Sequence, residues 1–121
     1  NYFDLPPTRT IICWDKLKRD KNFSMWEMAW TSFDKPAKIY KQSSMGDRIH
    51  PTQKPVALYE WLLMNYAKDG DKILDTHLGS GSIAIACHNL GFDLTACELD
   101  PDYYAAAMKR IEQHKNQQRL F

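Results

Sequence analysis

Residues 72–82 read Lys-Ile-Leu-Asp-Thr-His-Leu-Gly-Ser-Gly-Ser, in which a short apolar run is followed by a turn with two glycines. Gly79 and Gly81 lack a Cβ, so the backbone can bend sharply there and approach a ligand closely. Apolar residues at 83–87, followed by Gly91, predict a mostly buried helix that ends at a glycine C-cap. This order of strand, glycine turn and helix decides the fold.

A second strand is expected directly after this helix, at residues 93–97. It is short, contains Leu94 and Cys97, and ends at Glu98, so the three elements form a β-α-β unit. A carboxylate about 20 residues past the first glycine, at the carboxyl end of the second strand, is where such units bind ribose hydroxyls. Glu98 is therefore a candidate ribose ligand.

The glycine turn fits two kinds of ligand. With Glu98, the pattern Gly-x-Gly-x-x-Ala that begins at Gly79 matches a dinucleotide fingerprint, in which helix N–H groups bind a pyrophosphate. However, three residues separate Gly79 from Asp75, and a carboxylate at that place would repel an anion and attract an ammonium group. S-adenosylmethionine has an ammonium group, a ribose for Glu98 and an adenine that Leu99 could cover. A nicotinamide or flavin dinucleotide remains the alternative.

The composition bounds the class of protein. A chain of 121 residues with 44% apolar residues has room for one domain with a real core. Its longest apolar stretches, such as 83–87, are too short to cross a bilayer and no leader precedes them, so a cytoplasmic protein without membrane contact is expected. Cys13, Cys87 and Cys97 lack metal-ligand spacing and lie in apolar segments, which indicates buried free thiols and no metal.

The net charge of +1 hides an asymmetry along the chain. Residues 1–54 carry 10 Lys+Arg against 6 Asp+Glu, whereas residues 55–121 carry 6 against 9. A basic front half can follow a phosphate backbone, although an ordinary solvated surface is the alternative because Asp15 and Asp20 interleave with the lysines. The candidate DNA-binding residues are Lys16, Lys18, Arg19, Lys21, Lys35, Lys38 and Lys41.

The remaining elements lie on both sides of the central unit. Strands are expected at 10–14, 26–33 and 37–41, and Pro55 suits the first turn of a helix of about three turns. Asp100 is the expected N-cap of a last helix that begins at Pro101 and frays after His114. The side chains expected to face inward from that helix are Tyr104, Ala107, Met108 and Ile111.

Three segments of the chain resemble one known family. They are His-Pro-Thr-Gln-Lys-Pro at 50–55, Ile-Leu-Asp-Thr-His-Leu-Gly-Ser-Gly-Ser at 73–82 and Cys-Glu-Leu-Asp-Pro at 97–101. In this order they closely resemble the rear half of the permuted DNA amino-methyltransferases, which modify adenine N6 or cytosine N4. The opening of the chain and residues 27–33 look like segments of phage and prophage adenine enzymes, so the resemblance favours adenine and a bacterial or phage-encoded enzyme.

The resemblance implies roles for residues of this chain. Residues 75–82 are the first cofactor motif, Glu98 is the ribose-binding acid, and residues 50–55 close over the methionine end of S-adenosylmethionine. Thr76 and His77 stand where the commonest form of the motif has proline and phenylalanine. The implied cofactor-binding residues are His50, Thr52, Gln53, Lys54, Asp75, His77, Gly79, Ser80, Gly81, Ser82, Glu98 and Leu99.

The family's catalytic motif, Asp-Pro-Pro-Tyr or a serine variant, is absent from this sequence. In the family it holds the target amino group and stacks on a flipped base. Leu-Pro-Pro-Thr at 5–8 has neither the side-chain acceptor nor the aromatic ring at the needed places. We therefore expect no catalytic residue in this chain and no activity from it alone, with a catalytically dead remnant as a further alternative.

The expected fold is α/β, a Rossmann-like methyltransferase sheet that is mostly parallel, has helices on both faces and is incomplete. Residues 73–75 would be central with 94–97 beside them, and 11–14 and 27–33 would form an antiparallel pair at the far edge. The chain would be a single partial domain, with edge strands and basic loops at 1–48 and the cofactor-binding half at 49–121. Unpaired strand edges would then need an upstream half, a second chain or an exchanged homodimer, and double-stranded DNA would be the substrate.

Overall fold

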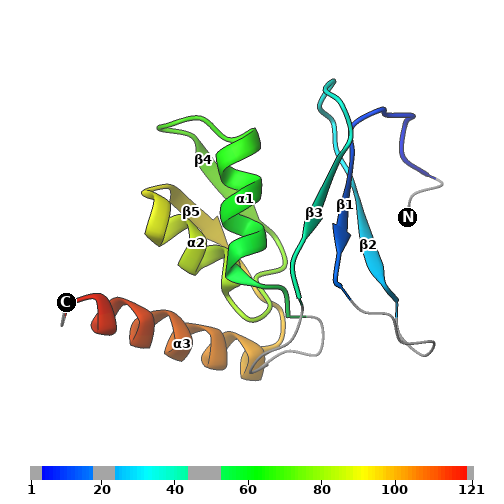
Figure 1. The fold of residues 1–121 in the computed structure, drawn as a ribbon. Helices are drawn as coiled ribbons and strands as arrows, with labels where there is room; N and C mark the ends of the chain where they lie inside the picture. Colours follow the sequence, from blue (N-terminus) through cyan, green and yellow to red (C-terminus); the bar gives the residue numbers. More distant parts are fainter. Residues whose placement is uncertain (1–3, 18–23, 44–52, 120–121) are drawn as a thin grey trace. The chain divides into compact units, whose positions relative to one another are not determined.

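A computed structural model describes residues 4–17, 24–43 and 53–119 of the chain (Figure 1). The chain divides into two compact units, Asn1–Met45 and Gly46–Phe121, and each is described here by itself. In chain order the elements are β1 (Ile11–Asp15), β2 (Trp26–Trp30), β3 (Lys38–Lys41), α1 (Val56–Tyr66), β4 (Lys72–Asp75), α2 (Ser82–Leu90), β5 (Asp93–Ala96) and α3 (Pro101–Arg119).

The first unit contains a three-stranded sheet with β1 in the middle. β1 pairs with β2 in antiparallel register from Ile11 opposite Trp30 to Asp15 opposite Trp26, which confirms the expected antiparallel pair. On its other side β1 pairs with β3 in parallel. Ile12 and Trp14 alternate along β1 and are buried, so one face of this strand belongs to the core.

β2 ends at Trp30, so the prediction that it continues to residue 33 was wrong. The reason lies in the hydroxyl groups that follow the last ladder pair. Thr31 Oγ1 donates to the carbonyl of Thr10 at 2.6 Å, and the buried Thr10 Oγ1 accepts from the N–H of Lys35 at 2.6 Å. These side-chain bonds replace strand pairing and turn the chain towards β3, which begins at Lys38.

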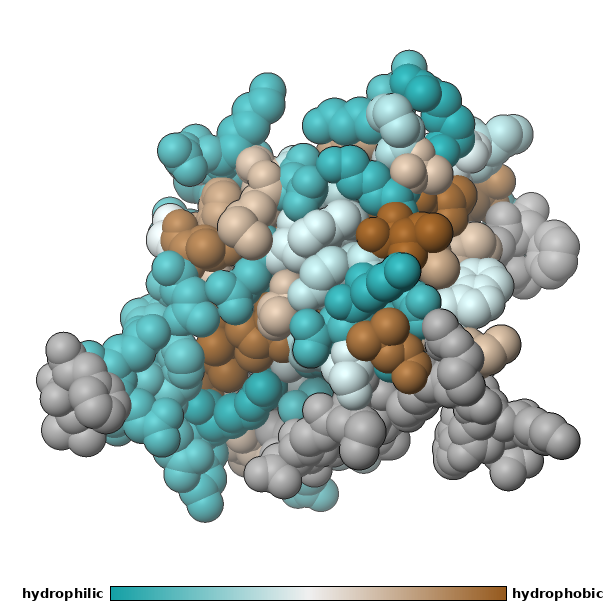
Figure 2. All heavy atoms as spheres, viewed as in Figure 1, coloured by the Kyte–Doolittle hydropathy of each residue, from teal (hydrophilic) through white to brown (hydrophobic). Residues whose placement is uncertain are grey.

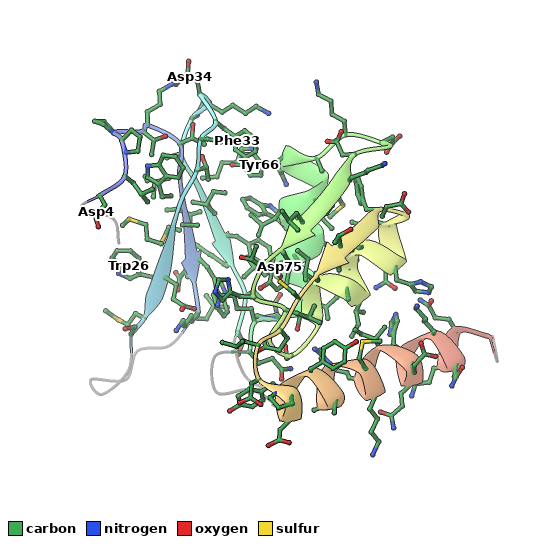
Figure 3. All side chains as sticks on the ribbon, turned by 180° about the vertical axis from the view of Figure 1, so that it is seen from behind. Asp4, Trp26, Phe33, Asp34, Tyr66 and Asp75 are labelled. Carbon is green, nitrogen blue, oxygen red and sulfur yellow. The ribbon has the colours of Figure 1, made fainter. Side chains whose placement is uncertain are left out.

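The second unit contains the predicted β-α-β arrangement. β4 and β5 pair in parallel from Lys72 opposite Asp93 to Asp75 opposite Ala96. The opposite views of Figures 1 and 3 place α1 and α2 on the same face of this strand pair. Buried side chains of α1 and α2 form a core on which Ile73 and Leu94 pack, whereas Leu74 is 71% exposed on the other face.

The two sheets contain three and two strands, and no ladder joins them among the residues described. This is the outcome expected for an incomplete α/β sheet that lacks its central strands. α1 and α2 share one face of the β4–β5 pair, so these two helices do not by themselves supply the cover expected on both faces. No helix in the described ranges is long and apolar enough to span a bilayer.

The helix ends follow the sequence signals in two places. α2 ends at Leu90, and its C-cap Gly91 has a left-handed φ of 78°. The N–H of Phe92 then donates to the carbonyl of Cys87 at 2.9 Å. Asp100 Oδ1 accepts from the N–H groups of Asp102 and Tyr103 at 2.9 and 3.1 Å, as predicted for an N-cap. Both predictions are confirmed.

α3 differs from its prediction in two respects. Ala107 and Ile111 are buried, but Tyr104 and Met108 are 48% and 38% exposed, so the inward face is narrower than expected. The helix also continues past His114 to Arg119, and Figure 2 shows a mostly hydrophilic surface over it. Side-chain bonds to α2 account for this extension: His114 bonds to Asn89 Oδ1 at 2.8 Å, and Gln118 Oε1 bonds to His88 at 2.7 Å.

The three cysteines are free but not equally buried. Cys87 is buried in the core of the second unit, Cys13 is half-buried and Cys97 is exposed, so the expectation of three buried thiols was wrong for Cys97. The strand period explains the difference, because Leu94 and Ala96 point inward and the next residue follows on the outer side. Burial raises the pKa of the Cys87 thiol, and the negative charge of Asp75 raises it further.

Candidate functional site

The second unit contains a cavity of about 300 Å³ at the carboxyl ends of β4 and β5. Three separate stretches of sequence supply its walls: the segment that enters α1, the loop between β4 and α2, and the residue that follows β5. Most of the side chains are polar. The residues that line it are Gln53, Lys54, Tyr59, His77, Leu78, Gly79, Ser80, Ser82 and Glu98.

Glu98 is the group that connects the two loops of this cavity. Its Oε1 accepts from the N–H of Gly79 at 2.8 Å, and its Oε2 accepts from the N–H of Asp100 at 3.0 Å. The carboxylate therefore bridges the loop after β4 and the loop after β5. Charge-assisted bonds of this kind are stronger than neutral ones, so Glu98 both carries the local negative charge and holds the loop backbone.

Asp75 lies at the end of β4 and is labelled in Figure 3. Its Oδ1 accepts from the N–H of His77 at 2.9 Å, which turns the chain sharply out of the strand. Thr76 Oγ1 lies 2.8 Å from His77 Nδ1, so the imidazole is held beside the cavity. The ladder is extended beyond β5 by a bond from the N–H of Cys97 to the carbonyl of Asp75 at 3.0 Å.

The turn between Leu78 and Ser82 depends on its glycines. Gly79 and Gly81 have φ values of 58° and 83°, in the left-handed region that favours residues without a Cβ. The N–H of Gly81 donates to the carbonyl of Leu78 at 3.1 Å, and α2 begins at Ser82. A Cβ on Gly81 would lie 3.2 Å from Ile111 Cδ1, so this backbone is pressed closely against α3.

The structure brings together most of the cofactor residues predicted from the sequence, but not all of them. Seven line the cavity, and three described residues do not: Asp75 and Gly81 support the loop, and Leu99 is 98% exposed. His50 and Thr52 lie outside the described residues. The seven lining residues are Gln53, Lys54, His77, Gly79, Ser80, Ser82 and Glu98.

Two lining residues were not named from the sequence: Leu78, although it falls within the cofactor motif at 75–82, and Tyr59. Tyr59 lies in an apolar stripe at helical spacing in α1, a pattern that favours a core position. Its place in the first turn, five residues after Lys54, was the available signal, because that turn follows the segment that reaches the cavity. Arg110 of α3, which contacts the glycine turn from outside the cavity, was also missed. No sequence signal distinguished it from the other polar residues of its helix.

The predicted DNA-binding residues lie in the first unit. Lys35, Lys38 and Lys41 are exposed. Lys16 is half-buried, because its Nζ lies 3.3 Å from Glu27 Oε2 and 5.4 Å from the centre of the Trp14 ring. Lys16 is thus partly neutralised by a neighbour. Lys18, Arg19 and Lys21 lie outside the described residues.

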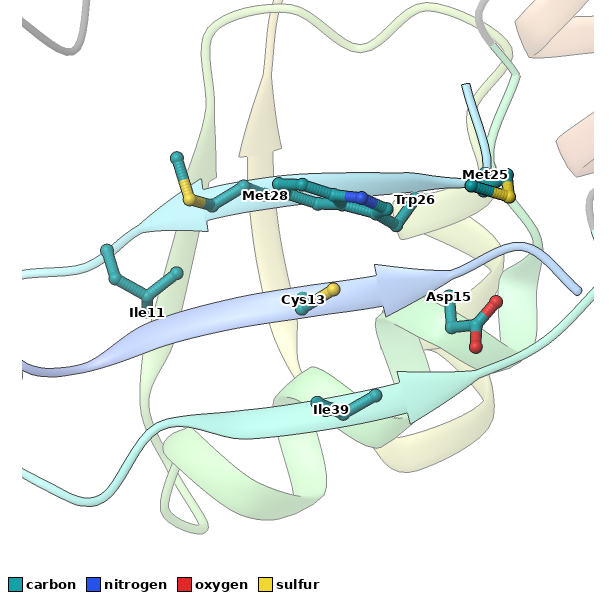
Figure 4. Close-up of a pocket in the computed structure, with 7 residues that line it drawn as sticks. All are labelled: Ile11, Cys13, Asp15, Met25, Trp26, Met28 and Ile39. Atoms are coloured by element: carbon teal, nitrogen blue, oxygen red, sulfur yellow. The ribbon is translucent and has the colours of Figure 1, made fainter. Parts of the chain in front are cut away.

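The first unit has a larger cavity of about 500 Å³ on one face of its sheet (Figure 4). Its walls are mainly apolar, and among them Ile39 and Trp26 are 65% and 51% exposed. Asp15 supplies the one carboxylate that lines it among the residues that the structure describes. This surface is suited to packing rather than to binding a charged small molecule. The lining residues are Ile11, Cys13, Asp15, Met25, Trp26, Met28 and Ile39.

Comparison with known proteins identifies the family. The sequence profile of a family described as DNA methylase matches residues 10–109, which is most of the chain. The chain belongs to the DNA methylase family. The match includes both units, from the first strand to the helix that follows Glu98.

Two curated relatives are type II methyltransferases. The chain is 34% identical over 67 residues to M.HpaI of Haemophilus parainfluenzae, a match that covers 55% of this chain and 21% of that protein. It is 38% identical over 63 residues to M2.DpnII of Streptococcus pneumoniae, with 52% and 24% covered. The matched part therefore spans about a quarter or less of the length of each relative.

Solved structures show a similar fold. The crystal structure of an M1.HpyAVI–SAM complex superposes with a TM-score of 0.68 at 24% sequence identity and covers 86% of this chain and 62% of that chain. A second structure of M1.HpyAVI gives a TM-score of 0.56 at 21% identity, with 84% and 58% covered. The expected α/β methyltransferase fold is confirmed by these likenesses.

Proposed function

We propose that the cavity of the second unit binds S-adenosylmethionine and that the chain is the cofactor-binding part of a DNA amino-methyltransferase. One observation carries this proposal. Seven residues that sequence reasoning assigned to this cofactor, from three separate segments, line a single cavity. The similar fold of a protein solved as a SAM complex supports the same ligand.

The chemistry of the walls matches the parts of this cofactor. Glu98 lines the cavity and accepts the ribose hydroxyls, because a carboxylate offers about four lone-pair sites to donors. Lys54 lines the cavity and neutralises the carboxylate of the methionine part. Asp75 does not line the cavity, but its charge at the end of β4 attracts the ammonium group. Leu99 is 98% exposed beside Glu98, where an apolar side chain can cover the adenine.

When bound, S-adenosylmethionine supplies a methyl group on a positively charged sulfur, which an exocyclic amine of a DNA base can accept. The residues of this chain then bind and orient, since such a transfer depends mainly on alignment. We propose adenine N6 as the target in preference to cytosine N4, on the resemblance of residues 27–33 to adenine enzymes of phages and prophages. We also propose that the enzyme has the permuted order of motifs and acts in restriction-modification.

The base-holding residues would come from another polypeptide segment, because no stretch of this sequence matches them. We propose that an upstream half, or a second chain in a homodimer, supplies them together with the missing central strands. Double-stranded DNA would then contact the exposed Lys35, Lys38 and Lys41 of the first unit. A cytoplasmic location in a bacterium, or a phage origin, fits this substrate.

Isothermal titration calorimetry with S-adenosylmethionine, its demethylated product and a nicotinamide dinucleotide tests the cofactor. We expect binding of the first two and none of the third. Glu98→Gln should weaken binding roughly 10- to 100-fold, since ribose loses a charged acceptor. Glu112→Gln is the matched control, because Glu112 is an exposed carboxylate of α3 that does not line the cavity. Binding of the dinucleotide without S-adenosylmethionine would overturn the proposal.

A further inference from the structure

Arg110 of α3 bonds to the glycine turn without lining the cavity. Its Nη1 donates to the carbonyl of Ser80 at 3.1 Å and to Ser82 Oγ at 2.9 Å, with Ser80 Oγ at 3.4 Å. Ser80 and Ser82 are 5% and 2% exposed and both also line the cavity. One guanidinium nitrogen thus reaches both serines of the turn from helix α3.

The peptide group between Ser80 and Gly81 is fixed at both ends. Its carbonyl accepts from Arg110, and its N–H donates to the carbonyl of Leu78. The plane of a peptide cannot rotate while both of its polar groups are bonded in this way. The turn that carries Gly79 and Gly81 is therefore held in one conformation by a residue that lines no part of the cavity.

The same face of α3 also contacts the turn through apolar atoms. Arg110 and Ile111 lie three and four residues after Ala107, so both side chains neighbour Ala107 on one side of the helix. A Cβ built on Gly81 would lie 3.2 Å from Ile111 Cδ1 and 3.4 Å from Ala107 Cβ. Close packing thus brings the guanidinium within hydrogen-bond reach of the serines.

The guanidinium of Arg110 loses part of its hydration where it bonds to the glycine turn. Burial lowers the pKa of its guanidinium, because a charged group loses hydration there. Among the residues described, no carboxylate forms an ion pair with it, and its bonds go to neutral oxygens of the turn. Arg110 is half-buried, and its hydrogen bonds to the turn offset part of the hydration that its charge loses.

We propose that Arg110 is a positioning residue for the S-adenosylmethionine site and sets the conformation of the glycine turn before the ligand binds. This inference rests on the proposed function of the cavity. A turn that is already ordered loses less conformational entropy on binding, so affinity rises without any contact between Arg110 and the ligand. Arg110 is not a catalytic residue in this scheme.

The test measures the affinity of folded protein for S-adenosylhomocysteine by calorimetry. Arg110→Met should weaken binding about 10- to 100-fold, on the scale of one or two charge-assisted hydrogen bonds. Arg110→Lys keeps the charge but lacks the planar fork, so it should restore only part of the affinity. Lys109→Met is the matched control, since Lys109 is the adjacent exposed cation of the same helix, and it should bind like the wild type.

Hydrogen exchange separates positioning from simple stabilisation of the helix. In Arg110→Met the amides of Gly79 and Gly81 should exchange faster, while those of α3 keep their protection. Ser82 also lines the cavity, so Ser82→Ala is used only in a double-mutant cycle: combined with Arg110→Lys, it should lose less affinity than the sum of the two single changes.

Three outcomes are distinguishable. If the wild type binds neither S-adenosylmethionine nor S-adenosylhomocysteine, the proposed function fails. If the wild type binds but folded Arg110→Met and Arg110→Lys bind equally well, the role of Arg110 is refuted. If Arg110→Met does not fold, the affinity of Arg110→Lys and its coupling to Ser82→Ala decide between the two results.

Discussion

Gly81→Ala should destabilise the second unit more than the same change at a comparable glycine. Gly81 and Gly91 both have left-handed backbones, with φ values of 83° and 78°. A new Cβ at Gly91 would meet nothing within 4 Å, whereas at Gly81 it would lie 3.2 Å from Ile111 Cδ1 and 3.4 Å from Ala107 Cβ. Gly91→Ala therefore reports the backbone term alone, and Gly81→Ala reports that term plus the contact with α3.

The magnitudes follow from these two terms. A left-handed conformation costs alanine roughly 1–2 kcal/mol, and the lower entropy of the unfolded alanine chain offsets about 0.4–1 kcal/mol of this. Gly91→Ala should thus lower the free energy of unfolding by about 1 kcal/mol. Crowding against two buried side chains adds about 1–3 kcal/mol, so the difference between the two variants should be about 1–3 kcal/mol in the same direction.

Urea unfolding followed by far-UV circular dichroism measures this difference. All three described helices belong to the second unit, so the helical signal reports that unit. Equal denaturation midpoints for Gly81→Ala and Gly91→Ala, with equal slopes, would refute the reasoning. It would mean that α3 does not press on the turn in solution.

Further predictions concern thiols, charge and activity. Iodoacetamide should modify the exposed Cys97 of the native chain before the buried Cys87, as followed by peptide mass spectrometry, and the reverse order would contradict the described burial. Folding raises the pKa of the Cys87 thiol, so the contribution of the protonated thiol to the free energy of unfolding is complete below the ordinary thiol pKa and is lost as pH rises through the raised value. Cys87→Ala should remove this alkaline loss of stability from unfolding curves. In an assembled enzyme, reversing the charges of Lys35, Lys38 and Lys41 should flatten the salt dependence of DNA affinity by about one log-log unit per lost phosphate contact, whereas Lys68→Glu should leave it unchanged. The isolated chain should transfer no labelled methyl group to duplex DNA, because alignment of the reacting groups is worth on the order of 7–11 kcal/mol. Methyl transfer should appear when the chain is mixed with a polypeptide that carries the proposed upstream half. Transfer by the chain alone would mean that one of its own residues holds the amine, with His77 or Asp75 the first to test.

Local chemistry made the centre of the fold predictable. The glycines at 79, 81 and 91 and the aspartate at 100 each occupy positions where few other residues fit, so the strand, turn, helix and cap could be placed from the sequence. The grouping of Gln53 and Lys54 with Glu98 came from the family resemblance rather than from any local rule. Their common place in one cavity is what the structure adds.

The errors come from contacts between distant residues. The end of β2 is set by hydroxyl bonds of Thr10, which lies about twenty residues earlier in the chain. The length of α3 is set by bonds from His114 and Gln118 to α2. Periodicity cannot reveal such partners, and it cannot show that a face as narrow as Ala107 and Ile111 is all that α3 buries. Arg110 was not predicted as a site residue for the same reason, because its partners Ser80 and Ser82 lie far from it in the sequence.

The exposed thiol of Cys97 gives experimental access to the cavity. Its Sγ lies 3.5 Å from the carbonyl of Thr76, and the next residue in the chain is Glu98. A fluorophore attached there would report ligand arrival by a change in emission, without a radioactive cofactor. Disulfide-linked fragments could be screened at the same position for groups that extend towards the carboxylate of Glu98. A position that packing leaves uncovered at the end of a strand thus becomes an anchor for covalent probes of this site.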